Sequence, residues 1–141
     1  MREVINWPIR VWMLFLSLIL SVVLAVGVVL SDVALIIFTS SLLVITVLFS
    51  RNSRLIISAS GELLVVGRAK IERRFIRDII PLDEVNMKYE RGAGINPRAF
   101  LAIRFWIKGG MKVVLDDPRD PTPYWLVSTN RALEFKKKLL Q

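Results

Sequence analysis

The chain begins with two long apolar runs that one charged residue separates. No charged side chain occurs from Val11 to Ser31 or from Val33 to Ser50, and Asp32 stands between the runs. At about 1.5 Å of rise per residue, a helix over either run can cross a hydrocarbon core of about 30 Å. One helix over both would be about twice too long and would bury Asp32 at mid-membrane. The pattern therefore predicts a two-helix transmembrane hairpin over residues 11–50, with its tip near Leu30–Val33.

A cleaved signal peptide is the competing interpretation of the first run. It is the weaker one, because the run is longer than a signal core and a second apolar run follows at once. Positive residues lie on one side of the hairpin only: Arg2 and Arg10 precede it, and Arg51 and Arg54 follow it. The positive-inside bias then predicts a multi-pass protein of the plasma membrane with both termini in the cytoplasm, residues 1–10 forming a cytoplasmic flank. The residues expected at the membrane interface are Trp7, Arg10, Trp12, Arg51 and Arg54.

Small residues recur at a spacing of four in the first apolar run. Ser17, Ser21 and Ala25 form one stripe of a helix, where a second helix can approach closely. Packing against the second span of the same chain is the favoured interpretation, because that partner is always present. The alternative is a dimer seam or a docking face for another membrane protein.

After residue 50 the apolar pattern changes to short segments that turns interrupt, which predicts a small α+β domain over residues 51–141. Asp83 is the expected cap of a short helix. The expected strands cover residues 54–59 and 62–66, two further strands at Ile71 and 75–80, the strands 100–107 and 111–115 joined by the turn "KGG", and a last strand over 124–128. The expected helices cover 84–91 and a stretch from Thr129 or Asn130 to Leu140, with Ala132, Phe135 and Leu139 on one face. This order resembles pleckstrin-homology-like domains, in which a bent antiparallel sheet closes on itself and a C-terminal helix plugs the open end. A different small α+β sheet is the alternative.

Charge and composition narrow the chemistry. The chain has 20 Lys and Arg against 12 Asp and Glu, a net charge of +8, and no Cys or His. Disulfides, thiolate or imidazole metal ligands and histidine-dependent nucleophiles are therefore excluded, and no cofactor is expected. Anionic lipid headgroups of the bilayer are the expected partner of the basic domain. Nucleic acid is not, because the positive residues are scattered rather than combined with an exposed aromatic platform.

The stretch "LDDPRDPTPYWLVST", residues 115–129, is the strongest candidate for a site. Its D-D-x-x-D spacing occurs in magnesium-dependent prenyl-diphosphate enzymes, but prolines oppose a helix here and no second acidic cluster exists, so no metal is expected. Two interpretations are left: a stiff connection between strands, or a partner-binding rim. Tyr124 and Trp125 alternate across a strand, so at most one of them is expected to face the core directly. The candidate rim comprises Asp117, Arg119, Asp120, Tyr124, Trp125, Arg98 and Arg104.

Three segments carry a family resemblance: "GRAKI", "NPRAFLAIRFW" and "DDPRDPTPYWLVSTNR". They resemble an actinobacterial membrane family, domain of unknown function 3093, whose members have two N-terminal spans and end in a D-P-x-D-P-T-P-Y-W-L-V-S-T signature. The signature is matched from Asp117 to Thr129, and the resemblance covers nearly the whole chain. It implies an architecture and a membrane location. It implies no activity, and so no catalytic residues.

The leading functional hypothesis is a membrane-anchored binding or scaffold module at the cytoplasmic face. The second is an accessory subunit of a larger membrane complex. An enzyme is the least favoured class, because without His or Cys it would depend on groups such as the carboxylates of Asp78, Asp83 and Glu84. Asp83 and Glu84 are better explained as the start of a helix.

Overall fold

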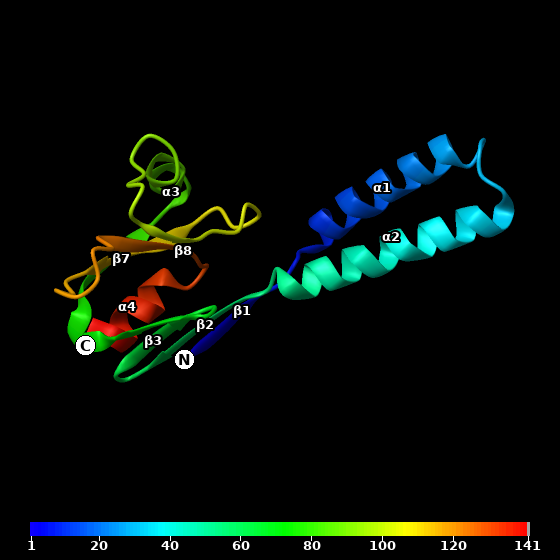
Figure 1. Cartoon of the computed structure of the whole chain (residues 1–141). Helices are drawn as coiled ribbons and strands as arrows, with labels where there is room; N and C mark the ends of the chain where they lie inside the picture. The colour runs from blue at the N-terminus through cyan, green and yellow to red at the C-terminus, as the bar shows by residue number, and fades with distance from the viewer. Residues whose placement is uncertain (141) are drawn as a thin grey trace. The chain divides into compact units, whose positions relative to one another are not determined.

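The computed structural model describes residues 1–140, and the chain divides into two compact units (Figure 1). We call Asn6–Arg54 the hairpin unit. We call the rest, Met1–Ile5 together with the chain from Leu55 onward, the sheet unit. Within the predicted N-terminal flank of residues 1–10, Arg2–Ile5 form a strand of the sheet unit.

The hairpin unit consists of helix α1 (Ile9–Val26) and helix α2 (Asp32–Asn52). The chain turns between Gly27 and Ser31, close to the expected tip. Asp32 lies in the first turn of α2, where a carboxylate interacts favourably with the helix dipole. Both helices are long and apolar enough to cross a membrane, which confirms the prediction of two long apolar helices.

The two helices pack along one seam and leave their other faces exposed. Val11 is buried on α1, and Thr46 and Ser50 are buried on α2. The large apolar side chains of the outer faces remain uncovered within the hairpin, for example Leu20 at 59% exposure and Ile37 at 62%. Such uncovered surface is unfavourable in water and favourable in lipid.

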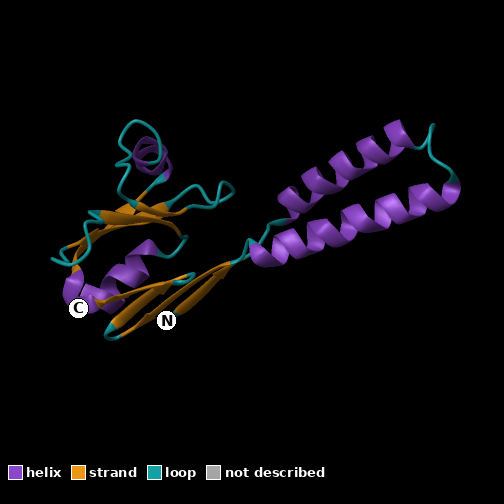
Figure 2. Ribbon diagram, in the orientation of Figure 1, coloured by secondary structure: helices purple, strands orange, loops and turns teal. Residues whose placement is uncertain are grey.

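The sheet unit contains two four-stranded sheets and two α-helices (Figure 2). The first sheet has the order β1-β2-β3-β4 and the second the order β5-β7-β8-β6. The strands are β1 (Arg2–Ile5), β2 (Leu55–Ser60), β3 (Leu63–Val66), β4 (Ala69–Glu72), β5 (Ile76–Leu82), β6 (Phe100–Ala102), β7 (Gly110–Leu115) and β8 (Tyr124–Ser128). The helices are α3 (Glu84–Glu90), α4 (Ala132–Leu140) and a short 3₁₀ turn, η1 (Arg73–Phe75).

The first sheet is antiparallel throughout and buries one face. Along β2, buried residues alternate with more exposed ones, so Leu55, Ile57 and Ala59 point to the core. β1 pairs with β2 in the register Arg2↔Ser58 to Ile5↔Leu55. The sequence gives little sign of β1, because its four residues hold two charged side chains and stand beside the longest apolar run of the chain.

The second sheet corrects two expectations. The stretch 100–107 and the strand after "KGG" were expected to form a hairpin, but the strand ends at Ala102 and its neighbour is β8, to which it is parallel. The domain is therefore two separate sheets with one parallel pair, rather than one bent antiparallel sheet. β5 also continues through Pro81 to Leu82; it is an edge strand, where the missing N–H of proline leaves no ladder bond unmade.

Helix α4 lies between the two sheets (Figure 1) and joins them into one core. Phe135 and Leu139 of α4 are fully buried, as their spacing on one helix face predicted. They contact a cluster to which β2, β3, β5, β7 and β8 all contribute. On the other side of the second sheet, α3 covers a smaller cluster of Met87, Tyr124 and Leu126. Asp83 caps α3 as expected, accepting a hydrogen bond from the Asn86 amide at 2.8 Å.

Candidate functional site

The aromatic pair of the signature stretch is buried, so the expectation that one ring stands at an exposed rim is wrong. Trp125 is 5% exposed and packs on Phe100 with ring centroids 5.0 Å apart. Tyr124 is 7% exposed and faces the other side of the sheet. The alternation of the two rings was predicted correctly. The structure covers both faces of β8, and all five of its residues are buried.

The hydroxyl of Tyr124 fixes the loop that follows α3. It accepts a hydrogen bond from the Asn96 amide at 2.8 Å and donates one to the Gly94 carbonyl at 3.4 Å. The ammonium group of Lys112 lies 4.3 Å from the centroid of the same ring. Tyr124 is therefore a structural tether between β8 and the loop, and its position gives it no free surface for a partner.

The aspartates of the stretch close turns. Asp117 accepts hydrogen bonds from the backbone N–H of Arg119 at 2.9 Å and from its guanidinium Nε at 3.4 Å. Asp120 accepts one from the Thr122 amide at 2.9 Å, and its contacts with Thr122 hold its pKa below the ordinary 3.8. Arg119 lies 5.0 Å from the centroid of the Phe75 ring. These contacts are those of a rigid connection between β7 and β8.

Arg98 and Arg104, the remaining residues of the candidate rim, lie elsewhere. The amide of Arg98 donates to the side chain of Asn96 within the loop after α3. The amide of Arg104 donates to the Ser128 hydroxyl at 2.9 Å, at the end of β8, and burial lowers the pKa of the Arg104 guanidinium. Asp120 precedes the start of this five-residue strand, so it and Arg104 lie at opposite ends of β8. The seven residues do not form one surface.

Thr129, the last residue of the signature, contacts Glu3, a residue that no sequence motif indicated. The Thr129 hydroxyl donates a short hydrogen bond to the Glu3 carboxylate, which also accepts from the Asn130 amide at 3.2 Å. Thr129 in turn accepts from the Arg131 amide at 3.0 Å, at the start of α4. Glu3 thus ties β1 to the helix between the sheets. Since 126 residues separate Glu3 from Thr129, no local pattern could have indicated the contact.

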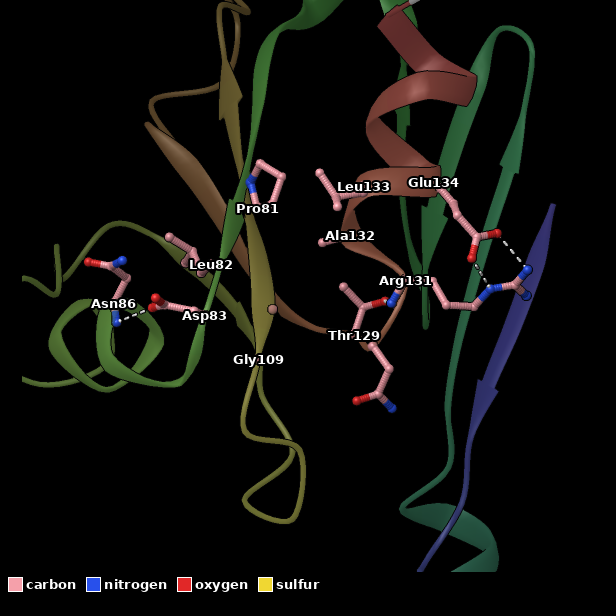
Figure 3. A pocket seen from close by; sticks show the side chains of 12 residues that line it. Pro81, Leu82, Asp83, Asn86, Gly109, Thr129, Arg131, Ala132, Leu133 and Glu134 are labelled. Carbon is pink, nitrogen blue, oxygen red and sulfur yellow. Dashed lines mark hydrogen bonds and ion pairs between the residues drawn. The ribbon is translucent and has the colours of Figure 1, made fainter.

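A hollow of about 640 Å³ lies between the start of α3, the edge of the second sheet and the start of α4 (Figure 3). Its charged side chains already have partners: Asp83 caps α3, and Arg131 binds Glu134 through two hydrogen bonds of 3.0 and 2.6 Å. That pair raises the pKa of Arg131 and lowers that of Glu134. The lining residues are Pro81, Leu82, Asp83, Asn86, Gly109, Gly110, Thr129, Asn130, Arg131, Ala132, Leu133 and Glu134.

The expected interface residues differ in their positions within the hairpin unit. Trp7 is 8% exposed, with its ring centroid 4.7 Å from that of Phe15 and 5.8 Å from that of Phe49, so it packs inside the unit. Trp12 is half-buried and meets Trp7 edge to face at 5.4 Å. Arg10, Arg51 and Arg54 are exposed.

The small-residue stripe does not pack against α2. Ser17, Ser21 and Ala25 are all exposed in the hairpin unit, and Ser17 donates to the Leu14 carbonyl of its own helix at 2.8 Å. The favoured interpretation, packing within the chain, is therefore wrong. Phe15 and Ile19 are among the half-buried residues of α1, so the seam lies two positions from Ser17, about 200° around the helix at 3.6 residues per turn.

These features define a class: a protein with two long apolar helices and a sheet domain whose first strand precedes them. The sequence matches a family described as "Protein of unknown function (DUF3093)" over residues 1–139, so the chain belongs to that family. No curated protein and no solved structure matches it.

Proposed function

We propose that this protein is a membrane-anchored binding module. Helices α1 and α2 cross the plasma membrane, and the sheet unit, with both termini, is held at its cytoplasmic face. The observation that carries the proposal is the uncovered apolar surface of both helices, on which large side chains such as Leu18 and Leu48 are more than half exposed. Water would oppose that surface, and a bilayer would cover it.

The sheet unit is joined to the hairpin at two places. Residues 6–8 connect β1 to α1, and Ser53 and Arg54 connect α2 to β2. Connectors of two or three residues reach about 10 Å at most, so the sheet unit stays close to the headgroups. Its excess of Lys and Arg favours anionic lipid there, each cation near the surface contributing about 1 kcal/mol.

The fold of the sheet unit is a variant of the pleckstrin-homology-like plan. Two four-stranded sheets and a C-terminal helix agree with that plan. The strand before the spans, the helix α3 and the parallel pair β6–β8 are departures from the simple antiparallel form. In this proposal the sheet unit binds a partner and performs no catalysis.

The candidate carboxylates each have a structural partner within the fold. Asp78 accepts from Lys136 at 3.1 Å and from the amide of its neighbour Ile79. Asp83 caps α3, and Glu84 pairs with Lys108 at 3.1 Å.

Flotation of the full chain with vesicles tests the proposal. The protein, reconstituted from detergent, should remain with the lipid fraction after a carbonate wash. Protein recovered in the wash would contradict membrane spanning. The protein, held in nanodiscs of neutral lipid, should bind added anionic vesicles, and this binding should weaken as the salt concentration rises. Binding that depends neither on salt nor on anionic lipid would contradict the proposed contact with headgroups.

A second candidate is an accessory subunit of a larger membrane complex. The outward stripe of Ser17, Ser21 and Ala25 favours it, because small residues on a lipid-facing side let another helix approach closely. Capture of the tagged protein in mild detergents should recover a membrane partner, and replacing Ser21 by Leu should abolish the recovery. Recovery of the bait alone in several detergents would contradict this candidate.

A further inference from the structure

The loop between β6 and β7 displays an aromatic ring to solvent. Phe105 is 65% exposed, whereas its neighbour Trp106 packs against the main core. The two rings meet edge to face, with centroids 4.8 Å apart. We call residues 103–109 the aromatic loop. A single exposed apolar side chain needs no explanation by itself, so its setting decides what it means.

The aromatic loop is held in a defined conformation. The Ile107 amide donates to the Arg104 carbonyl at 3.0 Å and closes a tight turn with Phe105 and Trp106 at its centre. At the base of the turn, the Arg104 amide donates to the Ser128 hydroxyl at 2.9 Å. Phe105 is therefore presented by a fixed turn, and its exposure is not that of a loose chain end.

An exposed cation follows the ring. The side chain of Lys108 is 74% exposed and lies 3.1 Å from Glu84. Arg104, which precedes the ring, is half-buried, and its guanidinium donates to the Ile103 carbonyl at 2.9 Å. An exposed aromatic ring beside an exposed lysine suits the boundary between headgroups and acyl chains, where the ring enters the apolar layer and the ammonium group stays with phosphates.

The aromatic loop leaves the sheet unit at the end where the chain also leaves for the hairpin. β1 ends and β2 begins at this end, where Ile5 pairs with Leu55. In Figure 1 the loop, in yellow, projects from the side of the sheet unit on which β1 ends and β2 begins. In Figure 3, a second view, the loop descends from Gly109 toward the same end as those two strands. The loop and both connectors thus share one end of the domain.

We propose that the aromatic loop is a membrane contact of the sheet unit, with the Phe105 ring at the acyl boundary of the cytoplasmic leaflet and Lys108 among anionic headgroups. This inference rests on the proposed function, since it needs the hairpin in the bilayer. It adds a third point of attachment beside the two connectors, which would fix the orientation of the domain against the membrane.

Single cysteines in this naturally cysteine-free chain allow a direct test. Phe105→Cys carries an environment-sensitive fluorophore in the full chain, reconstituted in vesicles of phosphatidylcholine and phosphatidylglycerol with nitroxide-bearing lipids. Val85→Cys, at a 75% exposed position of α3, is the matched surface control, and Leu20→Cys reports on α1. We expect a loss of fluorescence at position 105 that approaches the loss at position 20, and no loss at position 85.

The outcomes distinguish failure of the proposed loop contact from failure of the proposed membrane spans. Quenching at position 20 without quenching at position 105 would overturn the loop contact and leave the spans in place. No quenching at position 20 would overturn the proposed function itself. A blue-shifted but unquenched label at position 105 would mean that protein, from a partner or a second copy, covers the loop, and this too would overturn the lipid contact.

Discussion

At the scale of single residues, the hydroxyl of Tyr124 is the clearest structural contact of the signature stretch. Tyr124→Phe removes the acceptor of the Asn96 amide and the donor to Gly94. A partly buried N–H left without its acceptor costs about 1–2 kcal/mol. We therefore expect a loss of that size in the free energy of unfolding, measured by urea denaturation of the detergent-solubilised chain, and faster hydrogen exchange at Asn96.

Tyr89→Phe is the matched control, because Tyr89 is 61% exposed and its loss of a hydroxyl should leave the unfolding midpoint unchanged. Equal midpoints for the two variants would contradict the role given to Tyr124.

Gly110 lies at a close approach between two strands of the second sheet. A Cβ at this position would lie 2.5 Å from the Val127 carbonyl oxygen and 2.8 Å from the sulfur of Met87. Because backbone on the neighbouring strand must shift, Gly110→Ala should destabilise the chain by about 1–3 kcal/mol. Gly61→Ala, whose Cβ would meet nothing within 4 Å, should stay within about 0.5 kcal/mol of the wild type. Thermal unfolding of both variants checks the difference, and an equally stable Gly110→Ala would refute the packing described.

At the scale of elements, β1 makes the sheet unit depend on residues that precede the hairpin. Ile5 is 4% exposed and belongs to the main core, whereas its neighbour Val4 is 44% exposed. Ile5→Ala should therefore cost about 2–4 kcal/mol of unfolding free energy. Val4→Ala should cost less than about 1 kcal/mol. Denaturant unfolding compares the two, and similar losses would show that β1 is not part of the core.

The contact between α4 and β5 makes stability sensitive to acid. A hydrogen bond from Lys136, followed by one from the Ile79 amide, holds the pKa of Asp78 below 3.8. A carboxyl with a depressed folded-state pKa adds stability above its unfolded-state value of about 3.9, and loses it as pH falls through the folded value. Asp78→Asn should therefore lose less stability than the wild type between about pH 6 and pH 3. Urea midpoints at both pH values test this, and parallel losses would contradict it.

Elements that depend on residues close together in the sequence could be predicted. Strand pairings between residues far apart in the sequence could not. The cap at Asp83 and the buried face of α4 follow from residues three or four apart. The parallel pairing of β6 with β8 depends on residues far along the chain, and "KGG" looked like a hairpin turn. Tyr124 and Trp125 were expected to have one free face, because a strand pattern does not reveal that helices cover both sides of the sheet.

At the scale of the whole molecule, the chain enters the sheet unit twice. β1 precedes the hairpin and β2 follows it, and the two strands pair with each other. Pairing of β1 with β2 therefore joins the segments that precede and follow the hairpin. The hydrogen bond between Glu3 and Thr129 links β1 to the start of the C-terminal helix as well. The apolar runs made the two helices predictable. Their position between two strands that pair with each other could not be predicted, because it depends on β1, the four-residue strand before them.

The most direct test of the central claim is cysteine accessibility in intact cells. The chain has no cysteine, so Ser31→Cys at the hairpin tip and Gly61→Cys in the turn between β2 and β3 each supply one thiol. If α1 and α2 cross the membrane and hold the sheet unit inside, a membrane-impermeant reagent labels position 31 in intact cells and position 61 only after lysis. Labelling of position 61 from outside, or equal labelling of both positions before lysis, would contradict the account.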